Sequence, residues 1–338
     1  MRANKSRQTR SANQNKAPIT GPVLGGVSAR KPRRVAAPAG KPAFPGFIYN
    51  GGPIIASPVL FTSFWGALWS DPVLQTTAQR LNQFAQDLLN SNFMNVLSQY
   101  GVGSGNGSGS FGKASFVGNV PNQLTDGDIQ KIIQSSIKAG LIAEPPASNT
   151  SHVLIIFLDE KSEVKDTNLG VVMCEPSGDT AFGYHNGFTT AAGNPFYYGV
   201  IPALDDACIQ NSCGSSGCTL QLSQSQEQRR TQVTTHEFAE MVTDPNPPTG
   251  WYDQNDPNSG ECGDICSGES DTITGTTSSN VWTVQRIYSK YDDAQSNGSN
   301  YCLSQAASPK PVLAGGRTDS NFARRTRNAE AGGAEIVS

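Results

Sequence analysis

The residues with the clearest capacity for chemistry lie between positions 234 and 266. His236 and Glu240 are four residues apart, so on a helix they share one face with their Cβ atoms roughly 5–6 Å apart. Glu237 directly follows the histidine, in the order of the H-E-x-x-H helices that bind zinc. Glu240 replaces the second histidine of that pattern. Because zinc also accepts carboxylate oxygens, the stretch predicts a helix that supplies two metal ligands.

Two more carboxylates, Glu261 and Asp264, follow about twenty residues downstream. A helix with two ligands and a following loop with a third is the arrangement of a catalytic zinc site that keeps one position open. We therefore predict a Zn²⁺ site built from His236, Glu240 and either Glu261 or Asp264. Oxygen ligands are in the majority, so Ca²⁺ and Mn²⁺ are alternatives.

Three other side chains are candidates for catalysis. Glu237 is not needed as a ligand, and we expect it to take a proton from water and return it to the leaving amine. Tyr252 or His185 is expected to stabilise the developing oxyanion. His185 lies in the turn-rich segment 182–187 and is alternatively a fourth ligand or a proton donor. The predicted function is a zinc-dependent hydrolase, most readily a peptidase.

A non-catalytic protein is the main alternative. Four protein ligands would close the coordination sphere and make the metal structural. Two carboxylates also lower the Lewis acidity of zinc relative to two imidazoles. Without any metal, His236 and Glu240 could form a buried hydrogen-bonded pair, which would offset the cost of burying a carboxylate. Either arrangement would suit a secreted or cell-surface binding protein.

Charge is distributed unevenly along the chain. The 338 residues have a formal net charge of −3. Residues 1–50 hold ten Lys or Arg and no acid, and residues 305–338 hold five basic and three acidic residues. Residues 51–304 are left with ten basic and twenty-five acidic residues, a net charge of −15. Such an acidic core argues against nucleic-acid binding and suits a cation site.

Composition divides the chain into three parts. Residues 1–46 are basic and rich in Pro, Ala and Gly, which predicts a disordered tail. Residues 47–304 are predicted to form one metallohydrolase-type domain, and residues 305–338 a second disordered tail. The N-terminus lacks the apolar run of a signal peptide. No segment is apolar enough to span a membrane, and the oligomeric state is not indicated.

Six of the seven cysteines follow residue 207. Such clustering predicts disulfides and an oxidising, extracellular compartment. A cysteine-based metal site is the weaker alternative, because the tight C-x₂-C spacing is absent from 208–218. The odd count leaves one thiol over. The expected pairs are Cys266–Cys302 and one pair among Cys208, Cys213 and Cys218.

Apolar patterns predict an α+β domain with a loop-rich C-terminal part. Helices are predicted at 72–99 with a break near Asn90, at 125–140 and at 225–242. Buried strands are predicted within 54–69, at 152–159 and at 198–204, with short strands around 282–288. The helix at 225–242 is partly apolar, so we expect it to pack against the sheet.

Several motifs together resemble the EXORDIUM/phosphate-induced protein family of plants and its microbial relatives. The resemblance covers about residues 47–303. Its most distinctive part is the pairing of HExxE with the downstream GExGDxC. The matching motifs are Tyr49-Asn50-Gly51-Gly52-Pro53, Phe64-Trp65-Gly66, Gly183-Tyr184-His185, His236-Glu237-x-x-Glu240 with Thr243-Asp244-Pro245, Gly250-Trp251-Tyr252 and Gly260-Glu261-x-Gly263-Asp264-x-Cys266.

The resemblance implies an extracellular protein and, through the microbial relatives, a metalloprotease-like domain. The predicted domain is similar to zincin-type proteins, in which the motif helix packs beneath a mixed sheet. A peptide or cell-wall-type substrate is expected. Two features depart from the family. Plant members begin with a signal peptide where this chain has a basic segment, and Cys262 stands where an apolar residue is expected.

Overall fold

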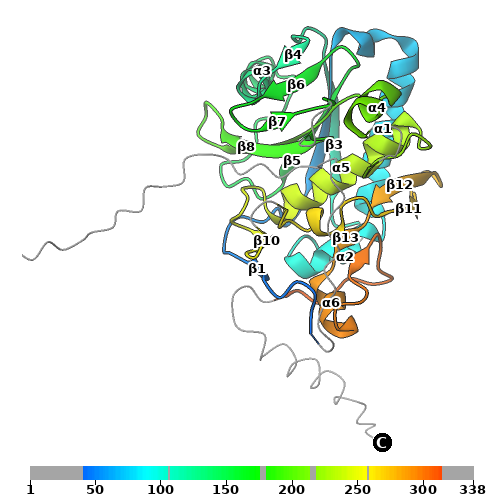
Figure 1. The fold of residues 1–338 in the computed structure, drawn as a ribbon. Coiled ribbons are helices and arrows are strands. Elements are labelled where there is room, and N and C mark those ends of the chain that lie inside the picture. Colours follow the sequence, from blue (N-terminus) through cyan, green and yellow to red (C-terminus); the bar gives the residue numbers. More distant parts are fainter. Residues whose placement is uncertain (1–40, 106, 176–179, 214–217, 257–258, 314–338) are drawn as a thin grey trace, which may run out of the picture.

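A five-stranded mixed sheet forms the centre of the protein. The computed structural model describes residues 41–313 except 106, 176–179, 214–217 and 257–258 (Figure 1). The strand order is β3-β2-β5-β9-β8. The first four strands are parallel, and the edge strand β8 runs antiparallel to β9. The strands are β2 (Val59–Trp65), β3 (Ser110–Val117), β5 (His152–Leu158), β8 (Tyr184–Thr189) and β9 (Pro195–Ile201).

Alternate side chains of β5 enter two different cores. Ile155 belongs to a core shared with α1 (Pro72–Asn90) and α5 (Gln226–Thr243). Its neighbour Ile156 belongs to a core shared with α3 (Asp126–Lys138) on the other face. Successive strand residues point to opposite faces, so the apolar run at 152–158 requires cover on both sides. The predicted α+β class with a mixed sheet is confirmed.

Helix boundaries follow the capping residues. The Ser225 side chain accepts from Gln228 N at 3.2 Å, and the Gln228 side chain accepts from Ser225 N in a reciprocal capping box. The Asp71 side chain caps α1 by accepting from Val73 N at 2.8 Å, without a reciprocal bond. At the other end of α1, Ser91 turns to extended backbone, so the predicted break near Asn90 is confirmed. A short helix, α2 (Phe93–Leu97), follows the break.

Two strand predictions have the wrong limits. Within 54–69 only Val59–Trp65 forms a strand, because Gly66 has φ 120° and a Cβ there would lie 2.1 Å from the Asp159 side chain. Ala67–Ser70 then forms a 3₁₀ turn. The strand predicted at 198–204 is shifted to Pro195–Ile201, and Leu204 already has φ 54°. Apolar residues continue past the strand ends, so hydrophobicity alone misplaces them.

The remaining elements are short and carry too little periodic pattern for the sequence to define them. Strands β12 and β13 are the exception, because they match the short strands predicted around 282–288. No helix in the described part of the chain is long and apolar enough to cross a membrane. The short elements are β1 (Phe47–Tyr49) paired with β10 (Trp251–Asp253), β4 (Gln123–Leu124) with β6 (Glu163–Asp166) and β7 (Val171–Val172), β11 (Ser270–Thr274) with β12 (Val281–Gln285), β13 (Ile287–Tyr288) with β14 (Cys302–Leu303), α4 (Asp206–Cys213) and α6 (Lys290–Ser296).

Helix α5 is buried on nearly all sides. It crosses the middle of the molecule in Figure 1 and packs against the sheet strands β8 and β9 on one side. The β11–β12 hairpin covers the other side. Every residue from Arg229 to Thr243 is buried. The predicted packing against the sheet is confirmed, and the hairpin explains why the polar face of the helix is buried as well.

Described residues at the start of the predicted C-terminal tail are tied to the domain. Lys310 N donates to Asn95 O at 3.1 Å and to Ser98 Oγ at 2.8 Å. Leu313 N donates to Gln99 O at 2.8 Å. These bonds hold residues 306–313 along α2 and the turn that follows it.

Three disulfides connect the loops. The predicted Cys266–Cys302 pair is confirmed, and Cys213–Cys218 is the pair expected within the 208–218 cluster. Cys174–Cys208 was not predicted, because Cys174 lies outside the cysteine cluster that follows residue 207. The remaining thiol, Cys262, is buried. Three disulfides are compatible with an extracellular protein.

The Cys266–Cys302 bond should contribute the larger share of loop restraint. Its sequence separation is 36 residues, against 5 for Cys213–Cys218. Loop-closure entropy predicts a loss of about 4 kcal/mol for Cys266→Ser with Cys302→Ser and about 2 kcal/mol for the matched Cys213→Ser with Cys218→Ser. Urea unfolding in the presence of chelator measures both. Equal losses in the two double variants would contradict the expectation.

Candidate metal centre

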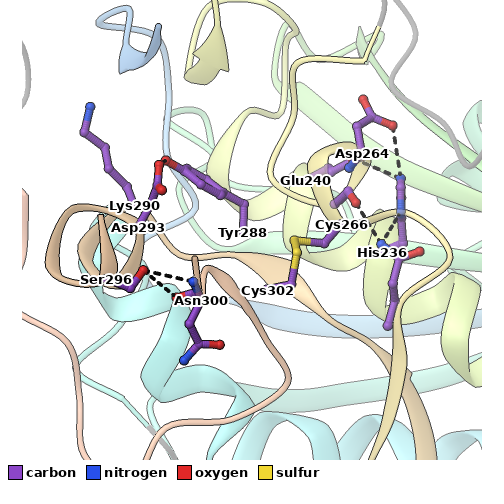
Figure 2. The surroundings of a disulfide bond; sticks show 12 residues. His236, Glu240, Asp264, Cys266, Tyr288, Lys290, Asp293, Ser296, Asn300 and Cys302 are labelled. Carbon is purple, nitrogen blue, oxygen red and sulfur yellow. Dashed lines mark hydrogen bonds and ion pairs between the residues drawn. A yellow bond between two sulfur atoms is a disulfide. The ribbon is translucent and has the colours of Figure 1, made fainter. Parts of the chain in front are cut away.

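Three elements bring the titratable side chains together. Helix α5 supplies His236 and Glu240, and the edge strand β8 supplies His185. The loop after β10 supplies Glu261 and Asp264, the latter at the start of a 3₁₀ turn over Asp264–Cys266. Figure 2 shows Asp264 and Glu240 meeting His236 beside the Cys266–Cys302 disulfide. All five residues are buried or nearly so.

The predicted ligands divide into two groups that share Glu240. In each group the candidate ligand atoms lie within 4.8 Å of one another. The first, which we call the helix group, is His236, Glu240 and Asp264. The second, the strand group, is His185, Glu240 and Glu261. The structure therefore places Glu261 apart from the helix group and gives His185 the position of a ligand.

The helix group converges on His236 Nε2. This atom lies 3.0 Å from Glu240 Oε1 and 3.7 Å from Asp264 Oδ1. Among the described residues it makes no hydrogen bond of good geometry, although the residue is fully buried. Glu240 Oε1 accepts from the Asp264 N–H at 3.0 Å, which fixes the loop against the helix. The Asp264 side chain is 11% exposed, so this group lies nearest to solvent.

The strand group is sealed from solvent. His185 Nε2 lies 3.5 Å from Glu261 Oε1, and His185 Nδ1 lies 3.6 Å from Glu240 Oε2. The other neighbour of Nδ1 is Glu237 Oε2 at 3.3 Å. The side-chain exposure of these residues is at most 2%. Glu237, predicted as a general base, thus holds the ring of His185.

The tautomer of His236 depends on Gln285, a β12 residue that the sequence did not single out. Gln285 Nε2 lies 2.8 Å from His236 Nδ1 and donates to Gly263 O at 2.9 Å. If this amide donates to Nδ1, the proton is on Nε2 and faces Glu240 Oε1 at 3.0 Å. The reverse amide orientation lets Nδ1–H donate and leaves the Nε2 lone pair for a cation, at the cost of the hydrogen bond to Gly263 O.

Crowding of acids perturbs the titration of the whole centre. Burial, and then the charge of Glu240, raises the pKa of Glu261 and Asp264 well above the usual range. Burial lowers the pKa of His236, but neighbouring carboxylates outweigh it and raise this pKa to about 10. Without a cation these groups hold protons. A divalent cation would replace the protons, because ligands bind metal in their deprotonated form.

Asp244 is a further acid that the sequence reasoning missed. Its Oδ1 accepts from Gly250 N at 2.6 Å, whereas Oδ2 is buried without a partner. Burial raises its pKa to about 7. The spacing His236, Glu240, Asp244 continues the same helix face by one more turn, and this signal could have identified it.

Tyr252 lies on β10 beside the centre and is 4% exposed. Burial raises its pKa, and the charges of Glu261 and Asp264 raise it further. The phenol therefore keeps its proton over the physiological pH range. The structure leaves Tyr252 available as a hydrogen-bond donor and does not make it a member of either ligand group.

Comparison with protein-family models, curated proteins and solved structures finds no match for this chain. The resemblance to the EXORDIUM family therefore rests on the motifs alone.

Gly263 gives a steric test of the helix group. A Cβ at this position would lie 2.7 Å from Glu240 Oε1 and 2.9 Å from His236 Nδ1. Gly263→Ala should therefore displace two of the three ligands, reduce bound zinc, and lower stability by about 1–3 kcal/mol through overpacking. Metal analysis and thermal unfolding measure both effects. The matched control is Gly118→Ala, where a Cβ meets nothing within 4 Å; equal behaviour of the two variants would contradict the geometry.

Proposed function

We propose that this protein is a zinc-dependent hydrolase of peptide bonds, with the catalytic ion held by His236, Glu240 and Asp264. The observation that carries the proposal is the buried His236 Nε2, which faces two carboxylate oxygens at 3.0 and 3.7 Å and has no hydrogen-bond partner. A cation between these atoms would satisfy the imidazole and neutralise the acids. Asp264, the partly exposed ligand, marks the side from which substrate would approach.

The donor set favours a transition metal over calcium. Calcium takes six to eight oxygen ligands, whereas this group offers one imidazole and two carboxylates. Zinc fits such a set, and Mn²⁺ is the runner-up. When bound, zinc supplies Lewis acidity and lowers the pKa of water toward 7. Three protein ligands leave room for a fourth, non-protein ligand.

Glu237 and Tyr252 supply the proton chemistry in this proposal. Burial raises the pKa of Glu237, although His185 opposes the shift. A carboxylate whose pKa is raised toward the working pH is a stronger base and a better general base. Glu237 takes a proton from water and returns it to the leaving amine. Tyr252 keeps its own proton and donates a hydrogen bond to the oxyanion.

Fold and resemblance support the same proposal. A helix with the HExxE pattern packs beneath a mixed sheet, as the similarity to zincin-type proteins implies. The EXORDIUM-like motifs and the three disulfides support an extracellular site of action on peptide or cell-wall-type material.

One observation favours a non-catalytic alternative. His236, Glu237 and Glu240 are all 0% exposed, and a structural metal site is closed in this way. A secreted or cell-surface binding protein with a structural ion would have the same ligands and would cleave nothing.

Glu237→Gln separates the two functions. The amide keeps the size of the side chain and can still accept from His185 Nδ1–H, so we expect bound zinc and fold to persist. Peptide hydrolysis should fall by about 10²–10⁴-fold, because the general base is lost. The control is Glu160→Gln, an exposed glutamate after β5. Rates over a broad peptide library and zinc content are measured together. Wild-type protein that holds zinc and cleaves nothing would establish the binding-protein alternative.

A further inference from the structure

We propose that the strand group, His185, Glu240 and Glu261, binds a second divalent cation, with Glu240 bridging the two ions. The inference depends on the proposed catalytic ion only through this shared carboxylate. Glu240 Oε1 lies on the His236 side, where it also accepts from Asp264 N. Glu240 Oε2 lies on the His185 side. One carboxylate thus offers a separate oxygen to each group.

The strand group contributes three buried atoms that could bind a metal and that no other described residue satisfies. They are His185 Nε2, Glu240 Oε2 and Glu261 Oε1, each without a hydrogen-bond partner. The three residues belong to a single candidate ligand set. Burying a polar atom without a hydrogen-bond partner is unfavourable, and more so when the atom is charged. His185 Nε2 and Glu261 Oε1 face each other at 3.5 Å, and Glu240 Oε2 approaches the other ring nitrogen, Nδ1, at 3.6 Å. Three unsatisfied atoms gathered around one imidazole point to a ligand common to them.

His185 is oriented as a metal ligand would be. Its Nδ1 faces the Glu237 carboxylate at 3.3 Å, while Nε2 faces Glu261. A ligating histidine typically donates its other ring N–H to a carboxylate, which fixes the tautomer and directs the lone pair at the ion. The Glu237–His185 contact therefore places the lone pair of Nε2 on the strand-group side.

Charge requires more than one divalent ion. Glu240, Glu261 and Asp264 bring three negative charges into a buried volume. Among the ion pairs of the described residues, no lysine or arginine meets these three carboxylates. One divalent cation leaves a net charge of −1 there, and the unpartnered Oδ2 of Asp244 adds another. With Glu237, five carboxylates are buried here, so a second divalent cation lowers the net charge from −3 to −1 in a site where unpaired charge is costly.

The two sites are expected to differ in access. The strand group has side-chain exposures of 0–2%, whereas Asp264 in the helix group is 11% exposed. The second ion would thus hold the edge strand, the helix and the loop together. Paired ions sharing a carboxylate also occur at hydrolytic centres, where they lie about 3.5–4 Å apart.

The three histidines of the chain permit a matched test. Full-length protein is stripped with chelator, reconstituted with Zn²⁺ and freed of excess metal, and zinc per chain is measured. We expect two zinc ions in the wild type, one in His185→Gln, one in His236→Gln and none in the double variant. His152→Gln is the control and should keep two, because His152 lies outside both groups.

Glu261→Gln and Asp264→Asn repeat the comparison without changing a histidine, and circular dichroism checks that each variant folds. Each should lose one of the two ions. The wild type loaded with Mn²⁺ should give an exchange-coupled electron paramagnetic resonance spectrum, and the single-ion variants should not.

The failures are distinguishable. One zinc in the wild type that His236→Gln removes and His185→Gln keeps would overturn the second site and leave the proposed function standing. One zinc that only His185→Gln removes would overturn both the bridging arrangement and the proposed catalytic ion. Two ions with uncoupled manganese signals would overturn the bridge through Glu240.

Discussion

The structure depends on the burial of several carboxylates around one turn of helix α5 with no lysine or arginine to neutralise Glu240, Glu261 and Asp264. Burying an unpaired charge is far costlier than burying an apolar side chain, so the centre needs protons or cations. The raised pKa values of Glu261 and Asp264 show how protonation would neutralise these acids. The unsatisfied nitrogen and oxygen atoms of the two groups favour neutralisation by bound cations instead.

The fold keeps the carboxylates from reaching solvent. The sheet and the β11–β12 hairpin clamp α5 from opposite sides. Gly263 and Gly183 allow close approach, since a Cβ at either would lie within 2.8 Å of a site carboxylate. The Cys266–Cys302 disulfide ties the ligand loop to β14, next to the hairpin. Rigid packing of this kind keeps the ligands in place in a catalytic and in a structural site alike.

Local chemistry made the larger part of the fold predictable. Caps at Asp71 and Thr125 predicted two of the helices, and the apolar run at 152–158 predicted the central strand. The spacing of His236 and Glu240 predicted their contact. Contacts that depend on strand pairing could not be predicted from the sequence. His185 meets Glu237 because β8 pairs with β9 in the register that puts His185 opposite Gly199. The roles of Gln285 and of the Cys174–Cys208 pair likewise depend on segments brought together only by the tertiary fold.

The central claim, that cations compensate the buried acids, is tested most directly by crystal diffraction from zinc-reconstituted protein at the zinc absorption edge. The account predicts anomalous peaks between His236 Nε2, Glu240 and Asp264 and between His185 Nε2, Glu240 and Glu261, with the Gln285 amide oxygen toward His236. Crystals with no anomalous peak at either position, and with the Gln285 amide nitrogen donating to His236 Nδ1, would contradict it.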